Sequence, residues 1–394
     1  MKYTCKKCGF EYEEKIIKFS ELLMSFKCPW CGADKTSFVS EDKQSNVGNS
    51  IETFDSEYVK ECYANGIKHY SGNGVTRDIK KAVSFFTYSA TKGYALAQYQ
   101  LGYCYDNGIG VEQNHTEAVK WYRLAAEQGH AGAQNNLGVC YYDGQGVEKN
   151  VNEAMKWFRL SAEQGNAEAQ TNLGDCYYNG IGVTLSLMEA VKWYRLAAEQ
   201  GYDEAQYNLG RCYYLGVGID KDSTEAVRWY NLAAEQGNSE AQYNLGICYF
   251  LGWGISKDLD EAFKWYKLSA EQGLAKAQYD LGECYKYGWG ISKNLDEAFK
   301  WYKAAAEQGY AKAQNNLGHY FYNGLGNERN YDEAFKWFKL SAEQKESVAQ
   351  YNLGLCYEFG RGVEKNLDEA IKWYKKSAEQ GYSSAQEKLD ELLK

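Results

Sequence analysis

The chain repeats itself every 36 residues. In the stretch 131–166, an Ala-x-Ala-Gln segment leads through a glycine turn to a second segment that begins at Asn150, and shifting by 36 residues recovers the same pattern. A period of this length is typical of solenoids built from helix pairs. Each repeat of a solenoid contacts only its neighbours, so 394 residues can form one array rather than two or three ordinary domains. We therefore expect an all-α fold, an α-solenoid of 36-residue helix pairs.

Nine repeats fit this period, and each predicts a helix A, a glycine turn and a helix B. The first repeat departs most from the pattern, as capping repeats do, and a closing helix is expected over 383–394. We assign residues 59–394 to the solenoid, with repeats that start at residues 59, 95, 131, 167, 203, 239, 275, 311 and 347.

The start and the end of helix B are marked in the sequence. Asn150 followed three residues later by Glu153 predicts a capping box. Trp157 and Phe158 then lie on the apolar face of the helix, and Gly165 ends it as a left-handed residue. Lys345 replaces that glycine in one repeat, where we expect an altered junction.

A glycine within helix A is the least expected part of the pattern. Gly138 and its equivalents each cost the helix about 1 kcal/mol of propensity. We expect them where a neighbouring helix approaches closely. The repeated Gln134 is predicted to form hydrogen bonds between helices.

These residues resemble the Sel-1-like repeat, a relative of the tetratricopeptide repeat. The resemblance covers about 330 residues through Ala-x-Ala-Gln-x-x-Leu-Gly-x-x-Tyr, Gly-x-Gly-Val and Glu-Ala-x-Lys-Trp-Tyr-x-x-Ala-Ala-Glu-Gln-Gly. It implies a right-handed α-superhelix that serves as a scaffold or adaptor for other proteins.

The net charge and the hydropathy of the chain indicate which kinds of partner and which cellular compartment to expect. The net charge of −9 argues against nucleic-acid binding, which needs a basic face. No run of about 18 apolar residues predicts a membrane span, and no apolar signal-peptide core opens the chain. We expect a cytoplasmic protein that does not contact a membrane.

Most of the twelve cysteines belong to the repeats. Seven occupy one helix A position, so each pair of equivalents lies on helices roughly 8–10 Å apart, too far for a disulfide. We expect these thiols to be free and buried in a reducing compartment. They are Cys104, Cys140, Cys176, Cys212, Cys248, Cys284 and Cys356.

The other clear cysteine pattern lies at the N-terminus. Cys5, Cys8, Cys28 and Cys31 form two Cys-x-x-Cys pairs, a spacing that fits a tetrahedral four-thiolate site. Such a site can hold iron or zinc, and both remain open here. A staple of this kind would compensate for the small core of residues 1–38.

The same segment resembles rubredoxin. The resemblance includes Tyr3, Tyr12 and Phe19-x-Glu-Leu, and continues through Cys28-Pro-x-Cys-Gly-Ala-x-Lys-x-x-Phe38. It implies one iron held by four cysteines and used in one-electron transfer; a zinc-ribbon clip is the structural alternative. The polar stretch 39–58 is interpreted as a linker to the solenoid.

The positions that vary within the repeat frame are the candidates for partner binding. By analogy with tetratricopeptide repeats, helix A lines a concave groove, where tyrosines beside mixed charges are typical of protein-binding surfaces. We select 203–310 as the candidate segment, and expect the tyrosines to face solvent. The candidate residues are Tyr207, Tyr243, Tyr279, Tyr351 and, in the A–B turns, Trp253 and Trp289.

Nothing in the chain predicts catalysis. The four histidines are scattered without metal-ligand spacing, and the Gly-x-Gly turns repeat in every unit and so serve the fold. The leading prediction is a non-enzymatic scaffold that binds a polypeptide. The alternative is a rubredoxin-type one-electron carrier whose solenoid holds its redox partner.

Overall fold

The computed structural model describes residues 2–5, 11–13, 38–40, 50–326 and 328–393. The three short strands form an antiparallel sheet in the order β2 (Glu11–Glu13), β1 (Lys2–Cys5), β3 (Phe38–Ser40). Tyr3 on the central strand lies opposite Tyr12 on one side and Ser40 on the other. This sheet brings together the two ends of the segment that carries the four N-terminal cysteines.

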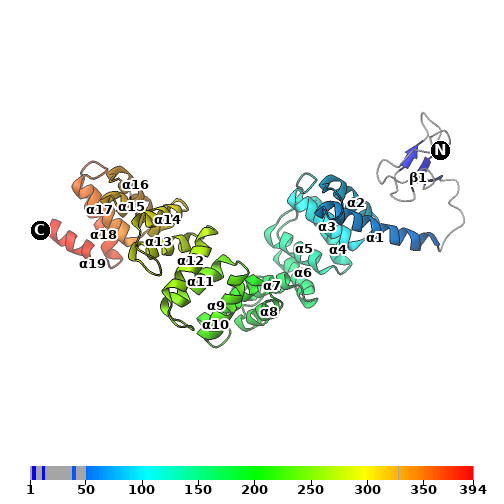
Figure 1. Cartoon of the computed structure of the whole chain (residues 1–394), viewed down its shortest axis with the longest axis horizontal. Coiled ribbons are helices and arrows are strands. Elements are labelled where there is room, and N and C mark those ends of the chain that lie inside the picture. Colours follow the sequence, from blue (N-terminus) through cyan, green and yellow to red (C-terminus); the bar gives the residue numbers. More distant parts are fainter. Residues whose placement is uncertain (1, 6–10, 14–37, 41–49, 327, 394) are drawn as a thin grey trace. The chain divides into compact units, whose positions relative to one another are not determined.

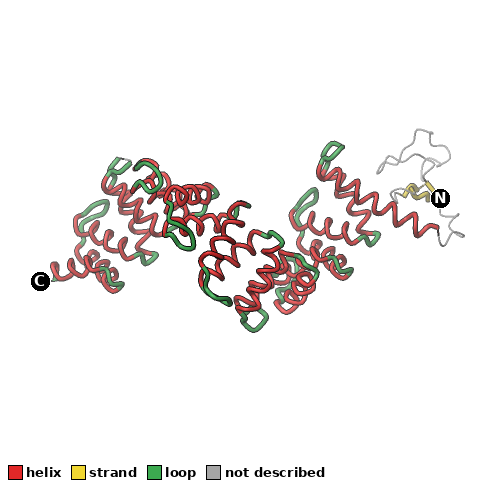
Figure 2. Tube along the Cα trace, turned by 60° about the horizontal axis from the view of Figure 1, so that its bottom comes forward, coloured by secondary structure: helices red, strands yellow, loops and turns green. Residues whose placement is uncertain are grey.

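The rest of the described chain consists of helices joined by short turns (Figures 1 and 2). It divides into two compact segments, residues 1–196 and 197–394, and each is considered by itself below. The A helices are α1 (Ser50–Ser71), α3 (Ala95–Asn107), α5 (Ala131–Asp143), α7 (Ala167–Asn179), α9 (Asp203–Leu215), α11 (Ser239–Leu251), α13 (Ala275–Tyr287), α15 (Ala311–Asn323) and α17 (Ser347–Phe359). The B helices are α2 (Ile79–Thr91), α4 (His115–Glu127), α6 (Val151–Glu163), α8 (Leu187–Glu199), α10 (Ser223–Glu235), α12 (Leu259–Glu271), α14 (Leu295–Glu307), α16 (Tyr331–Glu343) and α18 (Leu367–Glu379), and α19 (Ser383–Leu392) closes the chain.

The predicted α-solenoid of helix pairs is confirmed, whereas its handedness stays a prediction. Successive helices pack against one another from α1 to α7 in the first segment and from α9 to α19 in the second. The helices of a complete repeat are 13 residues long, and both glycines of each Gly-x-Gly turn between helices A and B have a left-handed φ. Among the described residues, no helix combines the length and apolar character needed to cross a membrane.

Helix B begins where predicted, but the capping box is only half formed. The side chain of Asn150 accepts a hydrogen bond from the backbone N–H of Glu153 at 3.2 Å. The backbone N–H of Asn150 donates instead to the carbonyl of Tyr141 in α5 at 2.9 Å. The Glu153 carboxylate therefore does not cap the Asn150 N–H. It lies 3.7 Å from the ammonium of Lys156 instead.

The first helix is longer than expected. Residues 50–58 were assigned to the linker 39–58, but they belong to α1, which has 22 residues. This stretch contains neither glycine nor proline, so the helix fixed by packing of its later turns can extend back to Ser50 without a break. The linker prediction is wrong for these residues.

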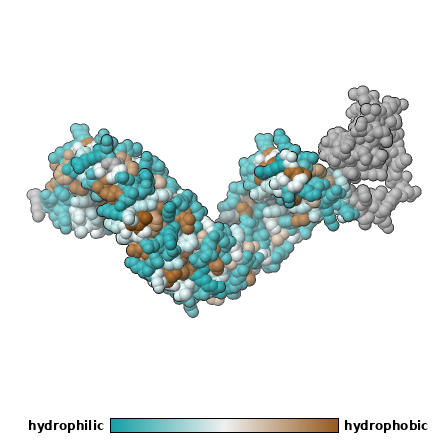
Figure 3. Space-filling model, viewed as in Figure 1, coloured by the Kyte–Doolittle hydropathy of each residue, from teal (hydrophilic) through white to brown (hydrophobic). Residues whose placement is uncertain are grey.

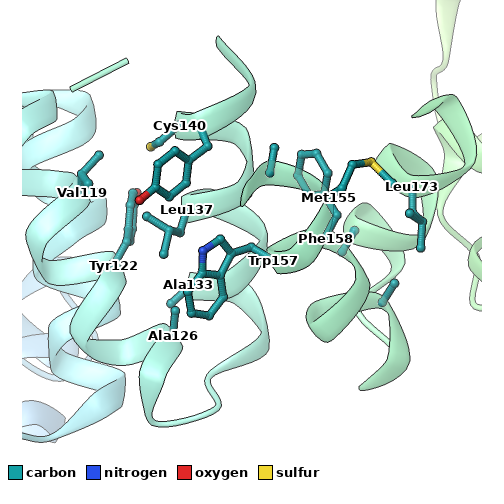
Figure 4. Packing of buried hydrophobic residues seen from close by; sticks show 14 of the residues in the cluster. Val119, Tyr122, Ala126, Ala133, Leu137, Cys140, Met155, Trp157, Phe158 and Leu173 are labelled. Atoms are coloured by element: carbon teal, nitrogen blue, oxygen red, sulfur yellow. The ribbon is translucent and has the colours of Figure 1, made fainter. Parts of the chain in front are cut away.

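The core is a row of side chains that fill the space between successive helices. In residues 1–196, Tyr122 of α4, Leu137 of α5, Phe158 of α6 and Leu173 of α7 are almost fully buried (Figure 4). Cys140 lies among them, as expected for a small apolar residue. All eight cysteines from Cys62 onward are buried thiols outside any disulfide, which confirms the prediction for the repeats.

Glutamines connect the helices at their ends. Gln134 donates from its side-chain amide to the carbonyl of Ala126 in the preceding B helix at 3.1 Å, and its own carbonyl accepts from Gln164 at 2.6 Å. The first of these bonds recurs one repeat later, where Gln170 donates to the carbonyl of Ala162. These bonds satisfy buried polar groups, so the glutamines are structural, as predicted.

Candidate functional site

The described part of the chain contains only one residue of the predicted metal site. Cys5 is the last residue of β1, and its neighbour across the sheet is Phe38 of β3. Cys8, Cys28 and Cys31 lie outside the described residues. Four thiolates remain a donor set that suits iron or zinc.

The A helices present a surface on which one position differs in every repeat. In the A helices from α3 to α17, the ninth residue is exposed or half-buried, whereas the seventh, eighth and tenth are buried. Its identity changes between apolar, acidic, basic and aromatic along the chain. The ninth residues are Tyr103, Val139, Asp175, Arg211, Ile247, Glu283, His319 and Leu355.

The candidate tyrosines lie at the fifth helix A position, and the structure corrects the expectation that they face solvent. Tyr207, Tyr243, Tyr279 and Tyr351 are all half-buried. Each packs against the tyrosine of helix B in its own repeat, with ring centroids 5.6 to 6.1 Å apart. The fifth position is not fully exposed because the glycine at the eighth position allows helix B to pack closely against helix A.

Hydrogen bonds fix two of these tyrosines to the next repeat. The hydroxyl of Tyr243 donates to Asp280 Oδ2 at 2.8 Å, and that of Tyr207 approaches Glu240 Oε2 at 3.4 Å. Burial and the neighbouring carboxylate raise the pKa of Tyr207 to about 12. Both hydroxyls are thus used in contacts within the solenoid.

The two turn tryptophans pack across repeat boundaries. Trp253 follows α11 and lies 5.5 Å from the ring of Tyr214 in the preceding repeat, yet 43% of it is exposed. Trp289 follows α13, lies 4.9 Å from Phe250, and stacks on Tyr287 at 4.8 Å. On the face shown in Figure 3, hydrophobic patches interrupt a mainly hydrophilic surface over the region where Figure 1 places α9 to α12. The tryptophans thus cover the core and also offer apolar surface.

A cavity of about 360 Å³ lies between α11 and α13. Its lining includes Tyr243, Tyr279 and Trp289, all of them predicted partner-binding residues, together with the carboxylates of Asp280 and Glu283. Sequence reasoning did not select Asp280. The available signal was a break in the repeat, because Asp280 occupies a position that is asparagine in six other A helices.

The N-terminal segment and rubredoxin are similar. The rubredoxin of Megasphaera elsdenii is 40% identical over 50 aligned positions, which span 96% of that protein and 10% of this chain.

Two solved structures are similar to the helical part. A protective antigen of uropathogenic Escherichia coli with an SLR fold is 34% identical, covers 88% of this chain and 82% of its own, and superposes with a TM-score of 0.62. A Sel1 repeat protein from Oxalobacter formigenes is 40% identical over 62% of this chain and 96% of its own, with a TM-score of 0.56.

The family model described as the Sel1 repeat matches nine consecutive stretches. They cover residues 61–94, 95–130, 131–166, 167–202, 203–238, 239–274, 275–310, 311–346 and 347–382. Together with the helix pairs, the buried glycine contacts and the glutamine bonds, these matches show that the chain belongs to the Sel1 repeat family.

Proposed function

We propose that this protein is a non-enzymatic scaffold that binds a polypeptide along its A helices. One observation carries the proposal: the buried positions of helix A hold the same residues in most repeats, whereas the exposed or half-buried ninth position holds a different residue in each helix from α3 to α17. A repeated frame needs the same residues for stacking in every repeat, so partner specificity must reside where the residues differ and reach solvent. Aromatic rings beside mixed charges are also typical of protein interfaces.

The candidate segment for this partner is 203–310. It contains Arg211, Ile247 and Glu283 at the ninth position, with Trp253 and Trp289 in the adjoining turns. Tyr207, Tyr243 and Tyr279 contribute their ring edges here. In the following repeats, Tyr351 offers a similar surface beside Leu355.

A selection of random peptides displayed on phage, with the full chain as bait, tests the scaffold. We expect Arg211→Ala and Ile247→Ala to weaken the selected peptides at least about tenfold, as truncation of interface hot spots does. The matched controls are Leu232→Ala and Leu268→Ala, which truncate exposed residues on the B helices. A larger loss in the B-helix variants, or no selected peptide, would contradict the proposal.

The N-terminus is proposed to carry one iron or zinc ion held by Cys5, Cys8, Cys28 and Cys31. The spacing of the two cysteine pairs, the similarity to a whole rubredoxin and the short antiparallel sheet support it. Elemental analysis of anaerobically purified protein, combined with a visible spectrum, identifies the metal.

A one-electron carrier is the second candidate function, and the similarity to rubredoxin favours it. In this case the solenoid would hold the redox partner near the metal domain. A red protein that bleaches on reduction and is reoxidised in air would support this function, whereas a zinc-containing, colourless protein would leave the scaffold alone.

A further inference from the structure

The cavity between α11 and α13 combines aromatic walls with a carboxylate. Tyr243 and Phe250 of α11, Tyr279 of α13 and Trp289 of the following turn line it, with the rings of Phe250 and Trp289 4.9 Å apart. Asp280 and Glu283 are the charged residues in its lining. Aromatic faces and carboxylates both attract cations, so the lining as a whole suits a positively charged group.

Asp280 breaks the repeat at this point. The equivalent residue is glutamine in α3 (Gln100) and asparagine in six other A helices, at Asn136, Asn172, Asn208, Asn244, Asn316 and Asn352. Several of these asparagines donate to the preceding repeat: Asn172 to Asn135 at 3.0 Å, and Asn352 to Asn315 at 2.9 Å. A carboxylate can only accept at this position when it is ionised. Because asparagine serves at this position in six other A helices, the stacking of repeats does not require the negative charge of Asp280.

The two carboxylates are satisfied to different degrees. Glu283 accepts from the hydroxyl of Tyr302 and from Asn316 at 2.8 Å, and Lys286 lies 3.7 Å away. Within the described residues, Asp280 accepts only from Tyr243 and forms no ion pair. Asp280 thus has acceptor capacity left for a cationic donor.

Two lysines, Lys312 and Lys276, lower the pKa of Asp280, but within the described residues neither forms an ion pair with it. Lys276 binds Glu240 at 2.5 Å, and its ammonium lies 4.6 Å from the Tyr243 ring. Burial is the main reason that the pKa of the Asp280 carboxyl is raised to about 6. Near neutral pH this carboxylate is consequently ionised in a poorly solvated place, which a bound cation would compensate.

We propose that this cavity accepts the arginine side chain of a partner polypeptide. The inference rests on the proposed scaffold function and adds the chemistry of one anchor residue. Arginine fits better than lysine because its planar guanidinium stacks on aromatic rings and presents a fork of donors to a carboxylate. A partner with a net positive charge would also be attracted to a chain of net charge −9.

The test uses N-acetyl-arginine methylamide as the probe and the full chain labelled with 5-fluorotryptophan. The ¹⁹F signal of Trp289 is assigned with the variant Trp289→Phe, and that of Trp253 with Trp253→Phe. Because one capped residue makes few contacts, we expect a Kd on the order of 1–10 mM. The probe should shift the Trp289 signal in a saturable way and leave that of Trp253 in place.

Two controls remove one charge each: a neutral analogue of the arginine probe, and a variant without the Asp280 carboxylate. N-acetyl-citrulline methylamide, and the arginine probe added to Asp280→Asn, should each bind at least about tenfold more weakly. Asn is the residue that this chain places in six equivalent positions, so the variant should fold. Equal binding of the citrulline probe, equal binding to Asp280→Asn, or no shift at Trp289 would each overturn the proposal.

These results separate the two proposals. A shift at Trp289 without any selected display peptide would support the arginine pocket and contradict the scaffold. Selected peptides that bind wild type and Asp280→Asn equally, together with an unshifted Trp289 signal, would leave the scaffold and remove the pocket.

Discussion

Gly138 of α5 lies directly against the ring of Phe158 in α6. A Cβ built on Gly138 would stand 2.7 Å from two carbon atoms of this ring. The same relationship recurs between Gly102 and Tyr122, and between Gly210 and Tyr230. The glycine is thus required by the approach of an aromatic side chain from helix B, which explains why it interrupts helix A in every repeat.

Gly138→Ala should therefore destabilise the protein. Alanine would gain about 1 kcal/mol of helix propensity, but overpacking against a buried ring typically costs 1–3 kcal/mol. We expect a lower midpoint of urea unfolding followed by circular dichroism. The control is Gly132→Ala in the first turn of the same helix, where the nearest atom to the new Cβ is 3.3 Å away on His130. Equal stability of the two variants would contradict this explanation.

Lys345→Gly should stabilise the protein. Lys345 follows α16 with φ of 68°, and it is the one non-glycine residue with positive φ in the described chain. A left-handed conformation costs an L-residue roughly 1–2 kcal/mol, which glycine avoids. We expect the unfolding midpoint to rise. Gly309→Lys, the reverse change at the equivalent position of the preceding repeat, should lower it; a fall in Lys345→Gly would show that the junction is not strained.

The sequence predicts those features that depend on local spacing. The period sets the helix pairs, Asn150 marks the start of helix B, and Gly138 indicates the close approach of another helix. The pairing of Glu153 with Lys156 was missed because the carbonyl that binds the Asn150 N–H belongs to another helix. A capping motif in the sequence does not show that a carbonyl of another helix will accept the hydrogen bond from the Ncap N–H.

The candidate site was predicted less well for a related reason. The exposure of Tyr243 depends on how closely helix B packs, and an analogy between families does not fix that distance. Asp280 was visible as a departure from asparagine, but its meaning depends on the cavity and on Tyr243, which only the packing of two repeats reveals.

The repeat thiols should resist modification until the protein unfolds. Burial raises the pKa of Cys140 to about 12 and that of Cys104 to about 11, and the thiolate is the reactive form. We expect a thiol probe at pH 8 to label the eight cysteines from Cys62 onward only after denaturation, as mapped by mass spectrometry. Labelling of Cys140 in the native protein, or a disulfide between two repeats, would contradict the buried, reduced state.

Loss of one metal ligand should unfold the N-terminal segment alone. Cys8→Ser is expected to abolish metal binding, since binding energy at such a site is folding energy. The helical signal should remain almost unchanged, because the repeats have their own cores. The control is Lys7→Ala, which changes a residue between Cys5 and Cys8 without removing a thiolate. This variant should keep the metal. A normal metal content in Cys8→Ser would refute the four-thiolate assignment.

Asp280→Asn should make the protein more stable near neutral pH, although it is expected to weaken arginine binding. Burial raises the pKa of Asp280 to about 6; Tyr243, Lys312 and Lys276 lower it, and Glu283 raises it. In the unfolded chain this carboxyl titrates near 3.9. Between about pH 4 and 6 the folded state therefore binds more protons than the unfolded state, and stability falls as the pH rises through this window.

The amide of asparagine cannot ionise, so Asp280→Asn should lack this fall and melt at a higher temperature than wild type at pH 7.5. Thermal unfolding of both proteins from pH 4 to 8 measures the difference. The reverse change in the preceding repeat, Asn244→Asp, should lower the melting temperature at pH 7.5 if a carboxylate at this position is costly in general. A lower melting temperature for Asp280→Asn at pH 7.5 would mean that the carboxylate stabilises the frame. A gain in stability combined with weaker arginine binding would instead identify Asp280 as a residue kept for its ligand, because a purely structural residue would not lower the stability of its own fold.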